Sequence, residues 1–273
     1  MTICSTSHNQ LSKAIFDSLD SRNDTKEARG FFRVSETTNC GRKLYYGRTG
    51  AKTTNPFPPQ VRTKMELGDV LHNWIRSKYI PENTDYEVTN WSEDKDKEDF
   101  LSYTFNDGNI SVVLGGHIDG ILRTWIKQGR NKRKLSAVAL LEVKTTGKFG
   151  YMGTKRVGCL DPDHWSGKYV AQANDYVGLW NLNNPKEKID QLCIFVFDTD
   201  GGKDPDTGLP HRDYWFAFDP DMFQARLQRR FDVERFLIKK ETPPRFYKDS
   251  SDFECSGCLW LNKCWEGPNG RNS

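Results

Sequence analysis

Apolar residues recur along the chain with two different periods, which predict helices in some stretches and strands in others. Between residues 59 and 79 the spacing is three or four, as on one face of a helix. The positions on that face are Met65, Gly68, His72, Ile75 and Tyr79. Three later stretches are short and rich in aliphatic and β-branched residues, which indicates strands. These stretches are residues 110–114, 118–126 and 137–145.

The second half of the chain predicts further helices and strands in alternation. The expected elements are a helix at 169–180, a buried strand at 191–197 and a second strand at 214–218. Asp219 followed by Pro220 is typical of a helix start, and this helix is predicted to run to about residue 240. Strands in the middle of the chain with helices around them predict an α/β fold, with a mixed central sheet flanked by helices.

Composition and charge are those of a folded, soluble protein. Hydrophobic residues make up 36% and charged residues 28% of 273 positions, which is enough chain for one large domain. No apolar run reaches the roughly 20 residues of a membrane helix, and residues 1–10 lack a secretory signal, so we expect a cytoplasmic protein. Residues 1–30 are polar and without a clear period, which predicts a loose arm before a single domain at 31–273. The net charge of +3 neither favours nor excludes a nucleic-acid partner.

An acid and a base share one face of the strand predicted at 137–145. Glu142 and Lys144 are two positions apart, so both side chains point away from the side of Val143. Asp119 lies 23 residues earlier and would reach Glu142 through a hairpin with a basic turn. Two adjacent carboxylates repel each other unless a divalent cation such as Mg²⁺ lies between them. The alternative is a structural ion pair between Glu142 and Lys144.

His72 is a third candidate for this site. It lies four residues after Gly68 on the face predicted to point inward, and Gly68 would allow a close approach to a neighbouring segment. A neutral imidazole aimed at two carboxylates is a good metal ligand, whereas a lone histidine on an apolar face is otherwise a core residue. His117, two residues before Asp119, is the rival candidate.

Four cysteines have the spacing of a metal site. Cys255, Cys258 and Cys264 fall within ten positions, and Cys40 is the candidate fourth ligand, which would tie the N-terminal part to the C-terminus. In a reducing compartment such a group binds metal more often than it forms disulfides. Four thiolates suit either zinc or an iron–sulfur cluster, so spacing leaves both open. Cys193 lies in an apolar stretch and is predicted to be an ordinary buried thiol.

The order of these motifs resembles that of RecB-like PD-(D/E)XK nucleases with an iron–sulfur cluster, in particular the CRISPR-associated exonuclease group and its stand-alone viral relatives. The resemblance spans residues 33–266. In chain order the motifs are Cys40 with Arg42 and Lys43, Gly68-x₃-His72, Gly116-x₂-Asp119, Glu142-Val143-Lys144, Gln172-x₃-Tyr176 and Cys255-x₂-Cys258-x₅-Cys264. Two departures are Ile118, which stands where the family motif has proline, and a long basic insertion between Asp119 and Glu142.

The resemblance implies a restriction-endonuclease-like core and an iron–sulfur lobe built from residues 31–48 and 243–266. The ligands implied for a [4Fe–4S] cluster are Cys40, Cys255, Cys258 and Cys264. The ligands implied for Mg²⁺ or Mn²⁺ are His72, Asp119, Glu142 and the carbonyl of Val143. Lys144 would be the catalytic lysine, and Gln172 and Tyr176 would complete the active-site face towards DNA.

The activity implied is a metal-dependent DNA exonuclease that acts from single-stranded ends, with endonuclease activity left open. Because the chain has no helicase motif, a helicase or recombination partner would be a separate protein. The residues expected to contact phosphates are Arg42, Lys43, Lys132, Arg133 and Lys134. The alternatives are a catalytically inactive module that recruits DNA or a partner, and a zinc-stabilised structural protein.

Overall fold

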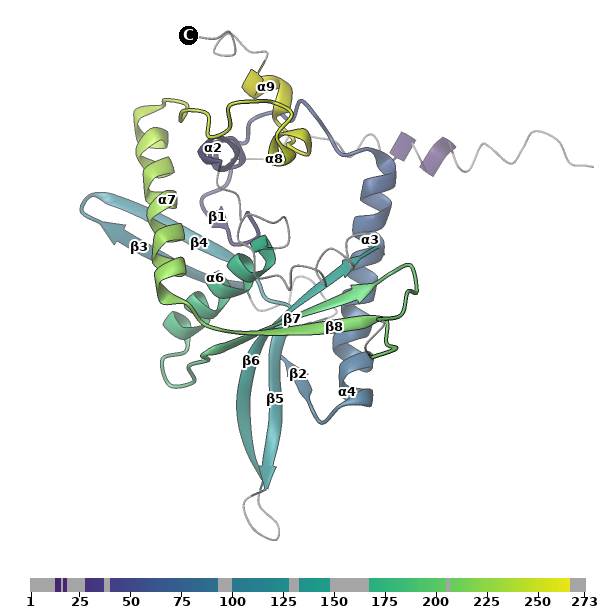
Figure 1. Cartoon of the computed structure of the whole chain (residues 1–273). Coiled ribbons are helices and arrows are strands. Elements are labelled where there is room, and N and C mark those ends of the chain that lie inside the picture. Colours follow the sequence, from purple (N-terminus) through teal and green to yellow (C-terminus); the bar gives the residue numbers. More distant parts are fainter. Residues whose placement is uncertain are drawn as a thin grey trace, which may run out of the picture.

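Two mixed sheets and the helices packed on them form the fold (Figure 1). The computed structural model describes residues 13–15, 17–18, 28–36, 40–92, 100–127, 133–147, 167–204 and 207–265, with the main chain alone at positions 133 and 137. The mixed α/β class expected from the sequence is confirmed. Within these ranges, no helix combines the length and the apolar character needed to cross a membrane.

The larger sheet has five strands in the order β2–β5–β6–β7–β8. Their bounds are β2 Glu87–Thr89, β5 Gly120–Lys127, β6 Arg133–Thr146, β7 Gln191–Asp198 and β8 His211–Ala217. Neighbours are antiparallel except β6 and β7, which run parallel. A parallel pair needs a crossover connection, and this one contains the helix α6, Gly167–Asn183. The sheet therefore has mixed strand directions, as predicted.

The smaller sheet has three strands in the order β1–β4–β3. Their bounds are β1 Phe32–Arg33, β3 Phe100–Asp107 and β4 Ile110–His117. Its inner face joins α6 and α7 (Pro220–Lys239) in one core, where Leu114 packs with Val177 and Phe223. β4 runs directly on towards β5 through Ile118 and Asp119, so the junction of the two sheets carries Asp119.

A long helical rod covers the other side of the larger sheet. It consists of α3 (Pro59–Trp74), the π-helical turn η1 (Ile75–Tyr79) and α4 (Ile80–Asn83). Ile75 is fully buried and shares a core cluster with Leu141 and Val143 of β6. The predicted inward face is wrong at Met65, which is 55% exposed. The reason is that α3 meets the sheet near Gly68, where an added Cβ would lie 3.1 Å from Thr145 Oγ1, and stands clear of the sheet before that point.

Segments from the two ends of the chain lie together in a lobe that packs on α7 (Figure 1, top). They are α2 (Gly41–Thr49), α8 (Phe253–Ser256) and α9 (Leu261–Trp265). The indole N–H of Trp260 donates to the carbonyl of Ala51 at 2.9 Å, and its ring lies 6.1 Å from that of Tyr46. The amides of Thr54 and Asn55 both donate to Leu259. These contacts join two stretches about 200 residues apart in the sequence.

Candidate functional site

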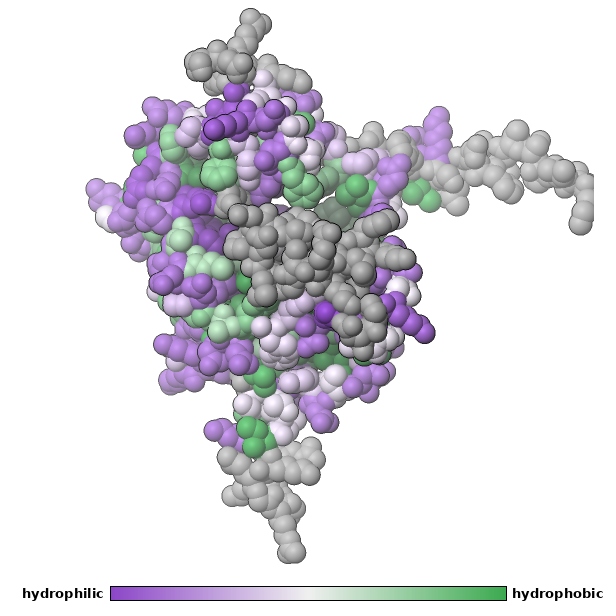
Figure 2. All heavy atoms as spheres, in the orientation of Figure 1, coloured by the Kyte–Doolittle hydropathy of each residue, from purple (hydrophilic) through white to green (hydrophobic). Residues whose placement is uncertain are grey.

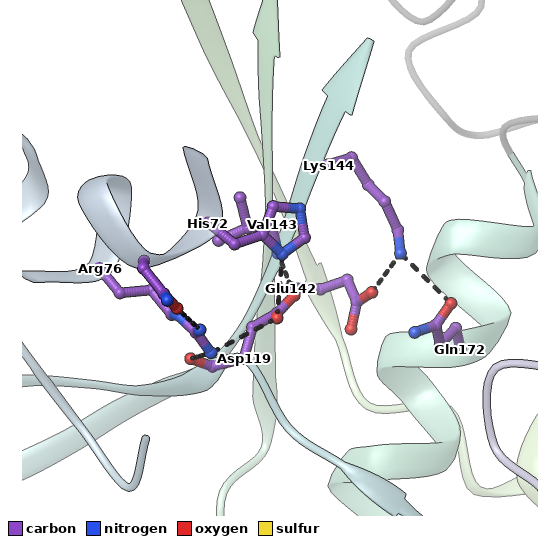
Figure 3. A network of polar contacts seen from close by, with 8 residues as sticks. His72, Arg76, Asp119, Glu142, Val143, Lys144 and Gln172 are labelled. Carbon is purple, nitrogen blue, oxygen red and sulfur yellow. Dashed lines mark hydrogen bonds and ion pairs between the residues drawn. The ribbon is translucent and has the colours of Figure 1, made fainter. Parts of the chain in front are cut away.

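Glu142 and Lys144 project from one face of β6 towards α6 (Figure 3). The neighbours Leu141 and Val143 are fully buried on the opposite face, as the alternation predicted. Lys144 Nζ lies 2.5 Å from Glu142 Oε1 and donates to Gln172 Oε1 at 3.3 Å. The lysine is thus held between its own strand and the first turns of α6.

Asp119 lies beside this strand because the two sheets meet there. The expected hairpin is present, and the pairing of β5 with β6 ends at Gly120 opposite Leu141. The amide of Val143 is therefore beyond the last strand pair, and it donates to Asp119 Oδ2 at 2.8 Å (Figure 3). In a strand, the N–H and C=O of one residue point to the same side. The carbonyl of Val143 consequently also faces Asp119.

The end of α3 and the π-helical turn add a histidine and an arginine to Asp119 (Figure 3). His72 Nδ1 lies 3.3 Å from Asp119 Oδ1. Arg76, one turn later, donates to the carbonyl of Asp119 at 3.3 Å and lies 3.8 Å from its Oδ1. The sequence reasoning missed Arg76, although its position one helical turn after His72 was a usable signal. The rival, His117, is exposed and lies 4.9 Å from the Phe100 ring.

Tyr176 closes the site from α6. It is 3% exposed and lies one helical turn after Gln172. An added Cβ on Gly116 would lie 2.6 Å from the Tyr176 hydroxyl, so only glycine fits at that point of β4. The structure therefore brings together His72, Asp119, Glu142, Val143, Lys144, Gln172 and Tyr176, from four segments of the chain.

The neighbouring charges give the two carboxyl groups very different pKa values, although burial acts on both in the same direction. Burial raises the pKa of Glu142 to about 7, and the charge of Asp119 adds to this effect while Lys144 opposes it. Burial also disfavours the charged form of Asp119, but His72, Lys144 and Arg76 outweigh it and lower the pKa of Asp119 to about 2. Because burial disfavours the charged form of Glu142, a cation bound beside it would stabilise that form strongly.

The donor set fits Mg²⁺ or Mn²⁺ in its chemistry. Two carboxylates, an imidazole and a main-chain carbonyl are oxygen-rich ligands of the kind that these ions prefer. As arranged, Glu142 is turned to Lys144, and within the part of the chain that the structure describes no three His, Cys, Asp or Glu side chains are grouped so as to hold a metal ion. A cation between Asp119 and Glu142 therefore requires the Glu142 side chain to turn away from Lys144.

The four candidate cysteines line one pocket in the lobe. Residues around it include Cys40, Cys255, Cys258, Cys264, Arg42, Lys43, Tyr46, Tyr247 and Trp265. Burial raises the pKa of Cys40, and the neighbouring Cys258 and Cys264 raise it further; burial likewise raises the pKa of Cys255 to about 11. Such thiols become thiolates when a metal group is bound. Cys193 is buried in β7, as predicted.

Zinc and an iron–sulfur cluster make different demands on these thiols. A zinc site draws all four sulfurs around one ion, at about 2.3 Å each. In a [4Fe–4S] cluster, the four cysteine sulfurs each bind a different iron atom. The four cysteines line a common pocket, and among the described residues no three of them are grouped so as to hold a metal ion. The cluster and the zinc ion both stay predictions for this pocket.

The residues expected to contact phosphates belong to two parts of the molecule, and two of them, Arg42 and Lys43, belong to the lobe. Arg42 donates to the carbonyls of Pro243 at 2.7 Å and Cys264 at 3.3 Å, so it holds the C-terminal segment. Lys43 lies near Lys168 at the start of α6, where partial burial and the charge of Lys43 lower the pKa of Lys168. DNA contacts for Arg42 and Lys43 stay predictions.

The predicted basic turn lies partly outside the described residues, but its flanks at Lys127 and Lys134 lie where the β5–β6 hairpin projects away from the rest of the molecule (Figure 1). Lys134 is exposed there, whereas Lys132 and the side chain of Arg133 lie outside the described residues. Trp125 and Ile126, towards this end of β5, are each about half exposed, and Figure 2 shows a small apolar spot at the same end. Lys127 is seven positions after Gly120, which is roughly 23 Å of strand, so this end of the hairpin is remote from Asp119.

No known family matches the sequence, and no curated protein matches it. Among solved structures, the crystal structure of SSO0001 is 15% identical, with 92% of this chain and 94% of that chain covered and a TM-score of 0.45. LHK-Exo in complex with dAMP is 14% identical, with 84% and 93% covered and a TM-score of 0.46. An alkaline exonuclease, LHK-Exo from Laribacter hongkongensis, is 15% identical, with 84% and 97% covered and a TM-score of 0.42. With TM-scores below 0.5, function has to be inferred from the site itself.

Proposed function

We propose that the protein is a Mg²⁺- or Mn²⁺-dependent DNA exonuclease of the RecB-like PD-(D/E)XK type that acts from single-stranded ends. The observation that carries this proposal is the meeting of Asp119, Glu142 and Lys144 with His72 in one partly buried cluster. A structural ion pair between Glu142 and Lys144 alone would not require a second carboxylate and an imidazole beside it.

Each residue has a distinct task in phosphodiester hydrolysis. His72, Asp119, Glu142 and the carbonyl of Val143 would hold the cation, which when bound polarises the phosphate and makes water a better nucleophile. Lys144 is placed to stabilise negative charge that develops on the phosphate in the transition state.

Two residues of α6, Gln172 and Tyr176, complete the proposed site. Gln172 accepts a hydrogen bond from Lys144 Nζ and so fixes its direction. Tyr176 lies close enough to Glu142 and Asp119 that their charges, after burial, raise the pKa of its phenol well above the usual value. The phenol therefore stays protonated and serves as a hydrogen-bond donor at the site.

The lobe has a structural role in this proposal. A [4Fe–4S] cluster on Cys40, Cys255, Cys258 and Cys264 would tie the two ends of the domain together. Hydrolysis transfers no electrons, so the reaction does not need the cluster for redox chemistry.

Linear and circular single-stranded DNA of the same sequence test the proposal. The protein is expected to degrade the linear strand with Mn²⁺ and to leave the circle intact, because an exonuclease needs an end. Cutting of the circle would show an endonuclease instead. Binding without cleavage of either DNA would favour the catalytically inactive module.

A further inference from the structure

Three rings are in contact on the surface of the smaller sheet. The centroids of Phe31 and Phe100 lie 5.5 Å apart, and those of Phe100 and His117 lie 4.9 Å apart. Phe100 is 43% exposed, and His117 is exposed as well. An added Cβ on Gly115 would lie 2.8 Å from the Phe100 ring. The missing side chain thus lets the ring lie close against β4.

The strand register puts an arginine on the same face. Phe100 pairs with His117, and Arg33 of β1 pairs with Gly115, so by alternation all four positions lie on one side of the sheet. Leu114, in between on β4, is fully buried on the other side. The rings and the exposed Arg33 therefore face away from the core.

This surface is continuous with the candidate active site. His117 and Asp119 are separated only by Ile118, which is 1% exposed and turned into the core. Two residues of extended chain span about 7 Å, which is close to the length of one nucleotide in an extended single strand. This surface thus ends beside Asp119, a residue of the site.

We propose that the exposed ring of Phe100, in edge-on or tilted contact with Phe31 and His117, is a stacking platform for one unpaired nucleobase, and that Arg33 contacts the phosphate of that nucleotide. The base would lie about one nucleotide from the phosphate at Asp119. Aromatic rings next to a cationic side chain are the combination that binds single strands with little sequence preference, because every base has a π-face. A base in a duplex remains stacked on its neighbours and cannot occupy the platform.

This inference rests on the proposed function and narrows its substrate to DNA with unpaired bases. The test is the affinity of the full-length protein for a fluorescein-labelled single strand, measured by anisotropy without added divalent cation. Phe100→Leu keeps the apolar bulk but removes the π-face, and it should weaken binding by at least about fivefold. Phe100→Trp should bind at least as tightly as the wild type. The matched control is Trp215→Leu, which alters an exposed aromatic residue on the edge strand β8 and should leave the affinity for the single strand unchanged.

Two further measurements separate stacking from general loss of binding. With a strand of abasic nucleotides, Phe100→Leu and the wild type should bind equally, because no base is present to stack. Arg33→Gln should reduce the slope of log affinity against log salt by about 0.7, the value for one phosphate contact on a single strand.

Equal affinity of Phe100→Leu and the wild type for the normal strand would overturn the platform, whether or not the protein cleaves DNA. No binding of any DNA by the wild type would overturn both proposals. If binding depends on Phe100 but no DNA is cleaved with Mn²⁺, the nuclease proposal fails while the platform stands as a single-strand binding site.

Discussion

If the lobe holds the proposed iron–sulfur cluster, replacing Cys40 by serine is expected to abolish the cluster and to destabilise the lobe. Cys40 precedes α2 and Cys264 lies in α9, so a shared cluster closes a loop of about 220 residues. Closing a loop of this length restricts the unfolded chain by about 5 kcal/mol in the chain-entropy treatment. The value is an upper bound, because residual structure already restricts the unfolded chain.

Iron content, visible absorbance and melting temperature, measured on one preparation, test this prediction. For a chain of this size about 2–4 °C is lost per kcal/mol, so Cys40→Ser should melt up to about 10–20 °C below the wild type. The control is Cys193→Ala, which removes a thiol buried in β7 and should leave iron content and colour unchanged.

Two results would refute this reasoning. A colourless wild-type protein with one bound zinc would exclude the cluster. A Cys40→Ser protein with full iron content and an unchanged melting temperature would show that Cys40 is not a shared ligand. If the variant instead remains folded and binds Mn²⁺ but loses all cleavage, the cluster acts in the reaction directly and the purely structural role is wrong.

Three further predictions concern the metal site and the DNA path. His72→Ala should weaken Mn²⁺ binding, measured by titration calorimetry, far more than it lowers the melting temperature; a fully active but strongly destabilised variant would make His72 a core residue. Burial raises the pKa of Glu142 to about 7, so below that pH Mn²⁺ has to displace the proton of Glu142 before it binds. Mn²⁺ should therefore raise the melting temperature more at pH 8 than at pH 6, and the reverse order would contradict this prediction. Replacing Lys132, Arg133 and Lys134 by glutamine should weaken binding of long single-stranded DNA but not of strands of about 3 nucleotides, since the hairpin end at Lys127 lies roughly 23 Å of strand from Gly120 and each extended nucleotide spans about 7 Å; equal weakening for both lengths would place the turn at the active site.

Parts of the fold with a strong local signal could be predicted from the sequence. Asp219 caps α7 by accepting from the amide of Met222, and Pro220 is the first residue of that helix, as expected. The alternation around Glu142 correctly predicted which β6 side chains share a face. Both features depend on neighbours within a few residues, so sequence spacing alone is sufficient to find them.

Features that depend on tertiary packing were not predicted from the sequence. β3 was not expected, because only Leu101 in it is buried and an exposed edge strand shows little apolar alternation. Met65 has the right helical spacing, but α3 stands clear of the sheet at that point. Arg76 is a charged residue at a position with core periodicity, and its burial depends on contacts from distant segments, namely Asp119 and the ring of Trp91.

Cleavage of end-labelled single-stranded DNA by Lys144→Ala tests the central claim most directly. Lys144 is placed to stabilise charge on the phosphate, so its loss should lower the rate by a factor of at least about 100 with either Mg²⁺ or Mn²⁺. Lys134→Ala, at the far end of the hairpin, is the matched control and should cleave a short oligonucleotide at the wild-type rate. Wild-type cleavage by a purified, folded Lys144→Ala protein would contradict the account.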